Sequence, residues 1–173
     1  MRHSSASRFF AAILIGLLVH APAVYASCTR QSGPTGPPFS QALVYDYTFD
    51  DTNCSAWQVS GSIYGPGGNG YVIFDAPGEL YQDIVVDTSF SSYALSFDVT
   101  IEGSSPGLEK LRIEVDGVQL EELNGNSSSG RYDYDPIGDY DNSTVRIRIY
   151  RPYTSFPGDT VFTVNWVEMW GRF

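Results

Sequence analysis

Hydrophobic and polar residues alternate strictly in three segments of the chain, residues 95–101, 111–116 and 145–150. Successive side chains of a β-strand point to opposite faces of its sheet, so each segment predicts a strand with one buried and one solvated face. Further short β-rich runs are separated by turn residues. The predicted strands are Ala42–Phe49, Trp57–Ile63, Gly70–Phe74, Glu79–Val86, Tyr93–Ile101, Lys110–Asp116, Val118–Leu123, Tyr132–Tyr134, Thr144–Arg151 and Thr160–Trp170. This pattern, without a helical period after residue 40, favours an all-β antiparallel sandwich.

The polar faces of the three alternating strands form the first candidate site. If the strands share a sheet, one face gathers Asp98, Arg112, Glu114, Arg146, Arg148 and Tyr150. Arginine and carboxylate groups fork pairs of sugar hydroxyls, and a tyrosine ring stacks on the apolar side of a pyranose. The concentration of arginines suits an acidic sugar, because a guanidinium binds a carboxylate through two parallel hydrogen bonds. A solvated face with cross-strand ion pairs is the alternative.

A second candidate site is formed by Tyr132 and Tyr134, which alternate with aspartates on a short predicted strand. Tyrosines at the rim of a sandwich offer rings on which a sugar can stack. The alternative is that both rings pack one edge of a sheet. Trp57, Trp166 and Trp170 lie on predicted strands and are expected in the core, because tryptophan is highly buried on average.

The N-terminus has the three parts of a signal peptide. Arg2 and Arg8 give it a positive start, residues 9–19 form an apolar run, and small residues precede Ala26. This run is too short to cross a bilayer of ~30 Å as a helix. We therefore expect a cleaved signal peptide at residues 1–26, a Pro/Gly-rich segment at 27–41 and one β-sandwich domain at 42–173.

Cleavage at this position changes the charge and the available chemistry. It removes both histidines and two arginines, and it leaves eight basic residues against 20 acidic ones, a net charge of −12. Without histidine, Ser-His-Asp triads and histidine-based zinc sites are excluded, and carboxylate chemistry or a hard metal such as calcium remains. The negative charge repels phosphate backbones and anionic membranes, so nucleic acid is not an expected partner. No second apolar run approaches membrane length, so no membrane span is expected.

Two cysteines, Cys28 and Cys54, remain after the predicted cleavage. An even number of cysteines in an exported chain predicts a disulfide, in keeping with a secreted or periplasmic location. Two free thiols are the alternative. A bond between these positions would stabilise the fold by very roughly 3–4 kcal/mol.

Five segments resemble, in chain order, the strands of galactose-binding-like jelly rolls. They are Tyr47–Asp51 with Trp57 following, Gly78–Ile84, Tyr93–Val99, Ile113–Gly117 and Asn165–Met169. Each segment alone is a weak signal, but their order and spacing cover most of residues 45–170. The resemblance implies an antiparallel jelly-roll β-sandwich, and many members of this group are carbohydrate-binding modules of glycoside hydrolases.

The resemblance also implies a structural calcium ion near the first and last strands. Asp50 matches the acidic residue of the first strand in this group. Asn165 stands where the group commonly has an aspartate, and this departure removes one negative charge from the implied site. A solvated turn after a strand is the alternative role for Asp50.

These observations favour a secreted, non-catalytic carbohydrate-binding domain with a glycan as its partner. A structural or adhesive surface protein is the first alternative. A carboxylate-dependent glycosidase or lyase is the second, since such enzymes need only two suitably spaced acids. A chain with 20 acidic residues contains such a pair by chance, so the sequence does not identify one. The oligomeric state is not predicted.

Overall fold

The computed structural model describes residues 28, 39–51, 54, 56–66, 68–86, 90–103, 108–138, 140, 144–154 and 158–172. The predicted signal peptide, residues 1–26, and most of the segment 27–41 lie outside the described residues. The described part contains ten strands and no helix. In this part, therefore, no helix is long and apolar enough to cross a membrane.

The strands are β1 Phe39–Ala42, β2 Gln58–Gly61, β3 Val72–Phe74, β4 Gly78–Val85, β5 Ser92–Glu102, β6 Lys110–Val115, β7 Val118–Asn124, β8 Gly130–Tyr134, β9 Thr144–Arg151 and β10 Val161–Arg172. All of their pairings are antiparallel. The strong alternation of the β5, β6 and β9 sequences places their bounds close to the predicted ones. The predicted and observed bounds of β9 are the same.

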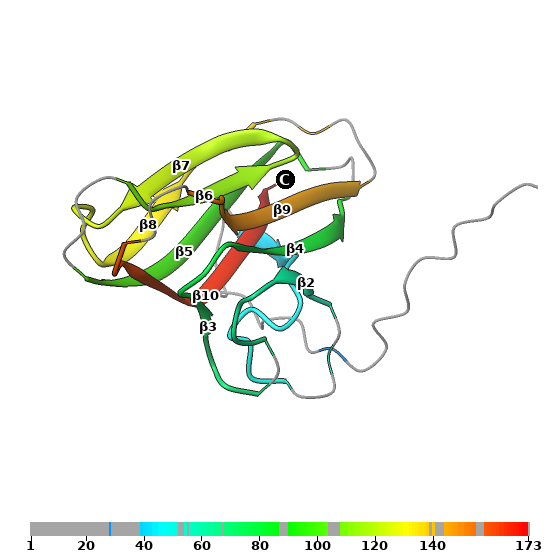
Figure 1. The fold of residues 1–173 in the computed structure, drawn as a ribbon. Coiled ribbons are helices and arrows are strands. Elements are labelled where there is room, and N and C mark those ends of the chain that lie inside the picture. The colour runs from blue at the N-terminus through cyan, green and yellow to red at the C-terminus, as the bar shows by residue number, and fades with distance from the viewer. Residues whose placement is uncertain are drawn as a thin grey trace, which may run out of the picture.

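The strands form two sheets of five strands, which pack as a sandwich (Figure 1). One sheet, here the β10 sheet, has the order β1-β10-β5-β8, with β3 also paired to β10. The other, here the β9 sheet, has the order β2-β4-β9-β6-β7. Neighbours in each sheet are often distant in sequence, as in a jelly roll. The predicted fold class is therefore confirmed.

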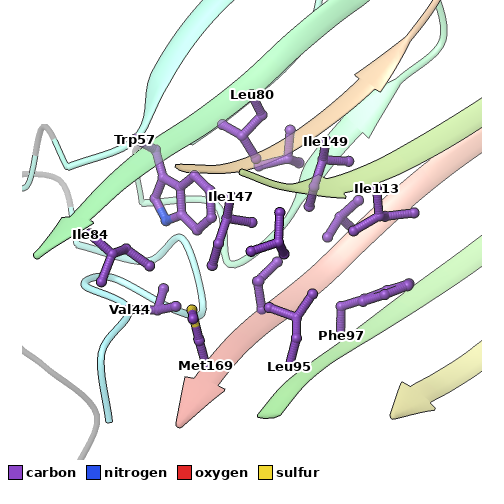
Figure 2. Packing of buried hydrophobic residues seen from close by; sticks show 14 of the residues in the cluster. Val44, Trp57, Leu80, Ile84, Leu95, Phe97, Ile113, Ile147, Ile149 and Met169 are labelled. Atoms are coloured by element: carbon purple, nitrogen blue, oxygen red, sulfur yellow. The ribbon is translucent and has the colours of Figure 1, made fainter. Parts of the chain in front are cut away.

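The core lies between the inner faces of the two sheets. Figure 2 shows Leu80, Ile113, Ile147 and Ile149 of the β9 sheet above Leu95, Phe97 and Met169 of the β10 sheet. Every one of these side chains is almost completely buried. The apolar rows predicted from alternation therefore face one another across the sandwich, and the polar rows face outward.

The turn between β6 and β7 has the predicted two-residue form. Val115 and Val118 pair across it, and both central residues have positive φ, 50° at Asp116 and 80° at Gly117. Two positive φ values give the turn a twist that matches the twist of the flanking strands, and Asp-Gly is a favoured sequence for it.

The strand predicted at Ala42–Phe49 is wrong over most of its length. Strand β1 begins at Phe39 and ends at Ala42, and the chain then turns with φ 48° at Asp46 and 58° at Phe49. These left-handed conformations cannot continue a strand. The buried side chain of Gln82 takes the place of a strand neighbour here, since its amide binds both the N–H and the carbonyl of Tyr45 at 2.9 Å.

The predicted core positions of the tryptophans are correct for Trp57 and Trp170 and wrong for Trp166. The β10–β5 register shifts between Val164 and Trp166, which is a bulge. The extra residue reverses the alternation, so Trp166 is only half-buried, and the guanidinium of Arg131 lies 5.3 Å from its ring centre.

The two cysteines are joined by the predicted disulfide, Cys28–Cys54. The bond links the first described residue of the chain to the segment that precedes β2. It therefore ties the N-terminal end of the chain to the sandwich.

Candidate functional site

The outer face of the β9 sheet carries the first predicted site. Its outward side chains come from four neighbouring strands and are named here the ladder face: Glu79, Tyr81 and Asp83 from β4; Arg146, Arg148 and Tyr150 from β9; Lys110, Arg112 and Glu114 from β6; and Glu122 from β7. Strand pairing aligns them in rows, for example Glu79, Tyr150, Arg112 and Glu122. The structure thus brings together Arg112, Glu114, Arg146, Arg148 and Tyr150, as predicted.

Every cation of the ladder face is paired with a carboxylate. Arg146 binds Asp83 through two hydrogen bonds of 2.6 and 2.7 Å. Arg148 bridges two acids, Glu79 at 2.5 Å and Glu114 at 3.2 Å. The remaining two cations share Glu122, with Arg112 at 2.8 Å and Lys110 also bonded to it. The cross-strand ion pairs that the sequence left as an alternative are therefore present.

The two tyrosines of the ladder face each lie beneath an arginine. The guanidinium carbon of Arg146 is 4.2 Å from the ring centre of Tyr81, and that of Arg148 is 4.0 Å from the ring centre of Tyr150. The Tyr150 hydroxyl also donates a 2.6 Å hydrogen bond to Glu114. These contacts hold the polar groups of the face in one arrangement.

The ion pairs shift the pKa values of the face in the expected directions. The hydrogen bond to Glu79 is the main cause that raises the pKa of Arg148, and that to Asp83 does the same for Arg146. The hydrogen bond from Lys110 is the main cause that lowers the pKa of Glu122. Each of these charged forms is therefore favoured by its neighbour.

Asp98 is not part of this face, which corrects the prediction. It lies on β5, in the opposite sheet, and its carboxylate accepts a 2.6 Å hydrogen bond from the amide of Asn165. The three alternating strands do not share a sheet, because β5 pairs with β10 and β8, whereas β6 pairs with β9. Alternation showed which side chains point outward but not which strands are neighbours.

The second predicted site, Tyr132 and Tyr134, lies on the edge strand β8. Both rings are half-buried and stack on Phe97, at centroid distances of 5.3 and 5.9 Å and interplanar angles of 11° and 12°. The Tyr134 hydroxyl donates a hydrogen bond to Glu121. The pKa of Tyr134 is raised, mainly by burial and next by this hydrogen bond to Glu121. One side of each ring is therefore part of the packing of the sandwich.

The structure places the two predicted metal ligands on different elements. Asp50 is exposed in the turn after Phe49, and Asn165 lies in the β10 bulge, where its amide donates to Asp98 and, at 3.1 Å, to Thr100. Within the described ranges, no three acidic, histidine or cysteine side chains form a group that could hold a metal ion.

A shallow depression of about 390 Å³ lies at one end of the ladder face, beside the segment that follows β9. Its lining includes Ser60, Gly78, Glu79, Arg148, Tyr150 and Pro152. Arg148 and Tyr150 were predicted as site residues, whereas Glu79 and Ser60 were not. The depression combines an aromatic ring, a guanidinium and a carboxylate, which are the groups that bind sugars.

The next residue after the lining, Tyr153, is the most exposed large apolar side chain described, with 83% of its surface accessible. Sequence reasoning missed it because no strand pattern reaches it. Glu79, Tyr81 and Asp83 were missed for another reason. Their alternation with Leu80 and Ile84 is visible in the sequence and shows that they point outward. What the sequence lacked was the pairing of β4 with β9, which brings them next to Arg148 and Arg146.

No protein-family model matches the sequence, and no curated protein matches it. Among solved structures, the chain is similar to TmCBM61 in complex with beta-1,4-galactotriose, with a TM-score of 0.53 and 16% identity over 77% of this chain and 100% of that chain. Two further similar structures have TM-scores of 0.42 and 0.41. One is the CBM36-1 domain of a xylanase from the hindgut metagenome of Trinervitermes trinervoides, 12% identical over 65% of this chain and 95% of that one. The other is the CBM22-1 xylan-binding domain from Paenibacillus barcinonensis, 8% identical over 79% and 98%. The first of these likenesses supports the β-sandwich fold of this chain.

Proposed function

We propose that this chain is a secreted or periplasmic, non-catalytic domain that binds a glycan in the depression at the end of the ladder face. The observation that carries the proposal is the lining of that depression. Tyr150 supplies a ring, Arg148 supplies hydrogen-bond donors and Glu79 supplies an acceptor, and the exposed Tyr153 directly follows the lining residue Pro152. Flat rings with a few placed polar groups suit the mixed apolar and hydroxyl surface of a sugar.

Two other findings support the proposal. One solved structure of similar fold, TmCBM61, is in complex with beta-1,4-galactotriose. The disulfide between Cys28 and Cys54 agrees with an oxidising, extracytoplasmic environment. Function is carried by sites rather than by folds, so the first of these findings has less weight than the lining residues.

Non-catalytic binding is favoured over a glycosidase by the pairing of the acids. A glycosidase needs one carboxyl group that carries a proton to give to the leaving oxygen. On the ladder face, Glu79, Glu114 and Glu122 each accept hydrogen bonds from an arginine. Acceptor oxygens held in this way are suited to orienting hydroxyls, and for Glu122 the hydrogen bond from Lys110 lowers the pKa, which opposes proton donation by that group.

Removal of the Tyr153 ring is expected to weaken glycan binding about ten-fold, because an aromatic contact contributes roughly 1–1.5 kcal/mol. The change Tyr153→Ala should leave the melting temperature unaltered, since the side chain is exposed. Calorimetric titration against a panel of polysaccharides measures the affinity. Tyr71→Ala is the matched control, because this exposed tyrosine precedes β3 and, unlike Tyr153, has no lining residue next to it in the chain. Equal affinities of Tyr153→Ala and the unmodified chain would contradict the proposed position of the site.

We further propose that calcium stabilises the turn that contains Asp50. Asp46 and Asp51 lie in this turn as well, and their carboxylates suit a hard cation, although the three acids do not converge as a ligand group and a cation would have to draw them together. Asp46 is almost completely buried; burial is the main cause that raises its pKa, and the charges of Asp50 and Asp51 raise it further. A bound cation would offset this repulsion, with backbone carbonyls and water as its remaining ligands.

Calcium is expected to raise the melting temperature of the unmodified chain and not that of Asp46→Asn. Asparagine tolerates the left-handed conformation at this position. Because the pKa of Asp46 is raised in the folded state, its favourable contribution is complete below the unfolded pKa and is lost as pH rises through the folded pKa. With chelator at neutral pH, Asp46→Asn should therefore be at least as stable as the unmodified chain. Differential scanning calorimetry with calcium and with chelator measures both effects, and no calcium response of the unmodified chain would refute the site.

A further inference from the structure

We propose that the depression on the ladder face selects uncharged glycans, and that Glu79 and Arg148 together bind a pair of sugar hydroxyls rather than an acidic group. This inference rests on the glycan-binding function proposed above. It is the opposite of what the concentration of arginines in the sequence suggests. The charges of the whole face, the cost of displacing an acid, and the hydrogen-bonding groups still available all support it.

The ladder face has no net charge. It carries four cations, Lys110, Arg112, Arg146 and Arg148, and four anions, Glu79, Asp83, Glu114 and Glu122. Each anion is bonded to at least one of the cations. The face is therefore not a positive patch on a negative protein, and nothing on it attracts a polyanion to a chain of net charge −10.

An acidic ligand would have to replace a carboxylate at Arg148. Its terminal nitrogens already bind Glu79 and Glu114, and the Glu114 side chain is only 14% exposed. A displaced Glu79 or Glu114 would remain within a few ångströms of the incoming acid. Two like charges at that distance in a partly desolvated site repel, so the exchange loses more than it gains.

A pair of hydroxyls can use the same groups without displacing them. Arg148 uses one terminal N–H towards each acid, which leaves three of its five N–H groups as donors. Within the described part of the chain, Glu79 uses only Oε2, so Oε1 can accept from a hydroxyl. One sugar hydroxyl would donate a hydrogen bond to Glu79, and a neighbouring hydroxyl would accept one from Arg148. Both side chains would then use hydrogen-bonding capacity that their ion pair leaves over. Tyr150, fixed beneath Arg148, supplies the adjacent ring.

The test compares neutral and acidic polysaccharides at low ionic strength, where attraction of an anion is strongest. The full chain is titrated calorimetrically with β-1,4-galactan and arabinoxylan as neutral probes, and with polygalacturonate and alginate as acidic probes. We expect at least one neutral probe to bind at least ten-fold more tightly than either acidic probe, with little change on adding salt. Tighter binding of polygalacturonate or alginate would overturn the inference while leaving the proposed function intact. Failure of all four probes would overturn both.

The variant Glu79→Gln separates the role of this acid from general charge effects. It removes the charged acceptor and releases one bond of Arg148, so affinity for the neutral probe should fall about ten-fold and affinity for polygalacturonate should rise. Asp83→Asn is the matched control. It makes the same charge change two rows away on β4, beside Arg146, and should leave the ratio of the two affinities unchanged. Equal changes of this ratio in both variants would contradict a specific role of Glu79.

Discussion

Replacement of Glu109 by glutamine is expected to lower the free energy of unfolding by about 3–5 kcal/mol, the cost of leaving one member of a buried ion pair unpaired. Glu109 and Arg151 are bonded, and their side chains are 0% and 4% exposed. One carboxylate oxygen also accepts the N–H of Gly158 at 2.8 Å, and the other accepts the N–H of Thr160 at 2.7 Å. Arg151 in turn donates to the carbonyls of Phe74 and Thr160, both at 2.8 Å.

Chemical denaturation at neutral pH measures this loss. The control is Asp83→Asn, which breaks the ion pair between Asp83 and Arg146. Arg146 lies on β9, as Arg151 does. The two side chains of that pair are 42% and 47% exposed, so water screens and replaces the interaction, and a loss of less than about 1 kcal/mol is expected. Similar losses in the two variants would show that burial of the Glu109–Arg151 pair has no special weight.

Replacement of Phe97 by alanine is expected to cost about 3–5 kcal/mol, the usual range for a buried phenylalanine. The Phe97 side chain is 0% exposed and lies on the inner face of the β10 sheet (Figure 2). It also stands between the rings of Tyr132 and Tyr134, so its removal leaves a cavity and takes away a stacking partner from both. The edge strand β8 should lose its anchor to the core as a result.

Thermal unfolding followed by near-ultraviolet circular dichroism reports both the stability and the packing of the two tyrosines. Val85→Ala is a suitable control, because Val85 is 60% exposed at the end of β4, and its truncation should change stability by less than about 0.5 kcal/mol. An unchanged near-ultraviolet signal in Phe97→Ala would mean that Tyr132 and Tyr134 do not depend on Phe97 for their positions.

The fold could be predicted from the sequence to the extent that alternation determines it. Residues 145–150 alternate without interruption, and β9 was predicted with its observed bounds. Alternation fails where a single residue leaves the pattern. The bulge at Asn165 turned Trp166 out of the core to a half-buried position, and the left-handed residues Asp46 and Phe49 prevent the first strand from reaching Phe49. Such departures depend on tertiary contacts, for example those of Gln82, that no local pattern records.

For the candidate site, the sequence predicts which side chains of one strand point outward, but not which strands lie next to one another. The outward positions of Arg146, Arg148 and Tyr150 follow from the period of two along β9. Whether these arginines are free to bind an acid depends on what lies on the neighbouring strands. One of these neighbours is β4, which contributes Glu79 and Asp83. It is separated from β9 by more than fifty residues of sequence. The sequence therefore suggested a positive surface where the structure has a neutral one.

The Glu109–Arg151 pair also bears on how the ligand site can change. It fixes Arg151, which lines the depression and precedes Pro152 and Tyr153, and Thr160, which precedes β10. Because Arg151 is held by the buried pair, its part of the lining is pre-organised, and a ligand at the proposed site need not supply the conformational entropy of ordering it. Substitutions at Pro152 and Tyr153 can change the groups next to this anchor while the sheet stays as it is. If the proposed site binds a glycan, its specificity can therefore change through these exposed residues without loss of stability, because the buried pair is left intact.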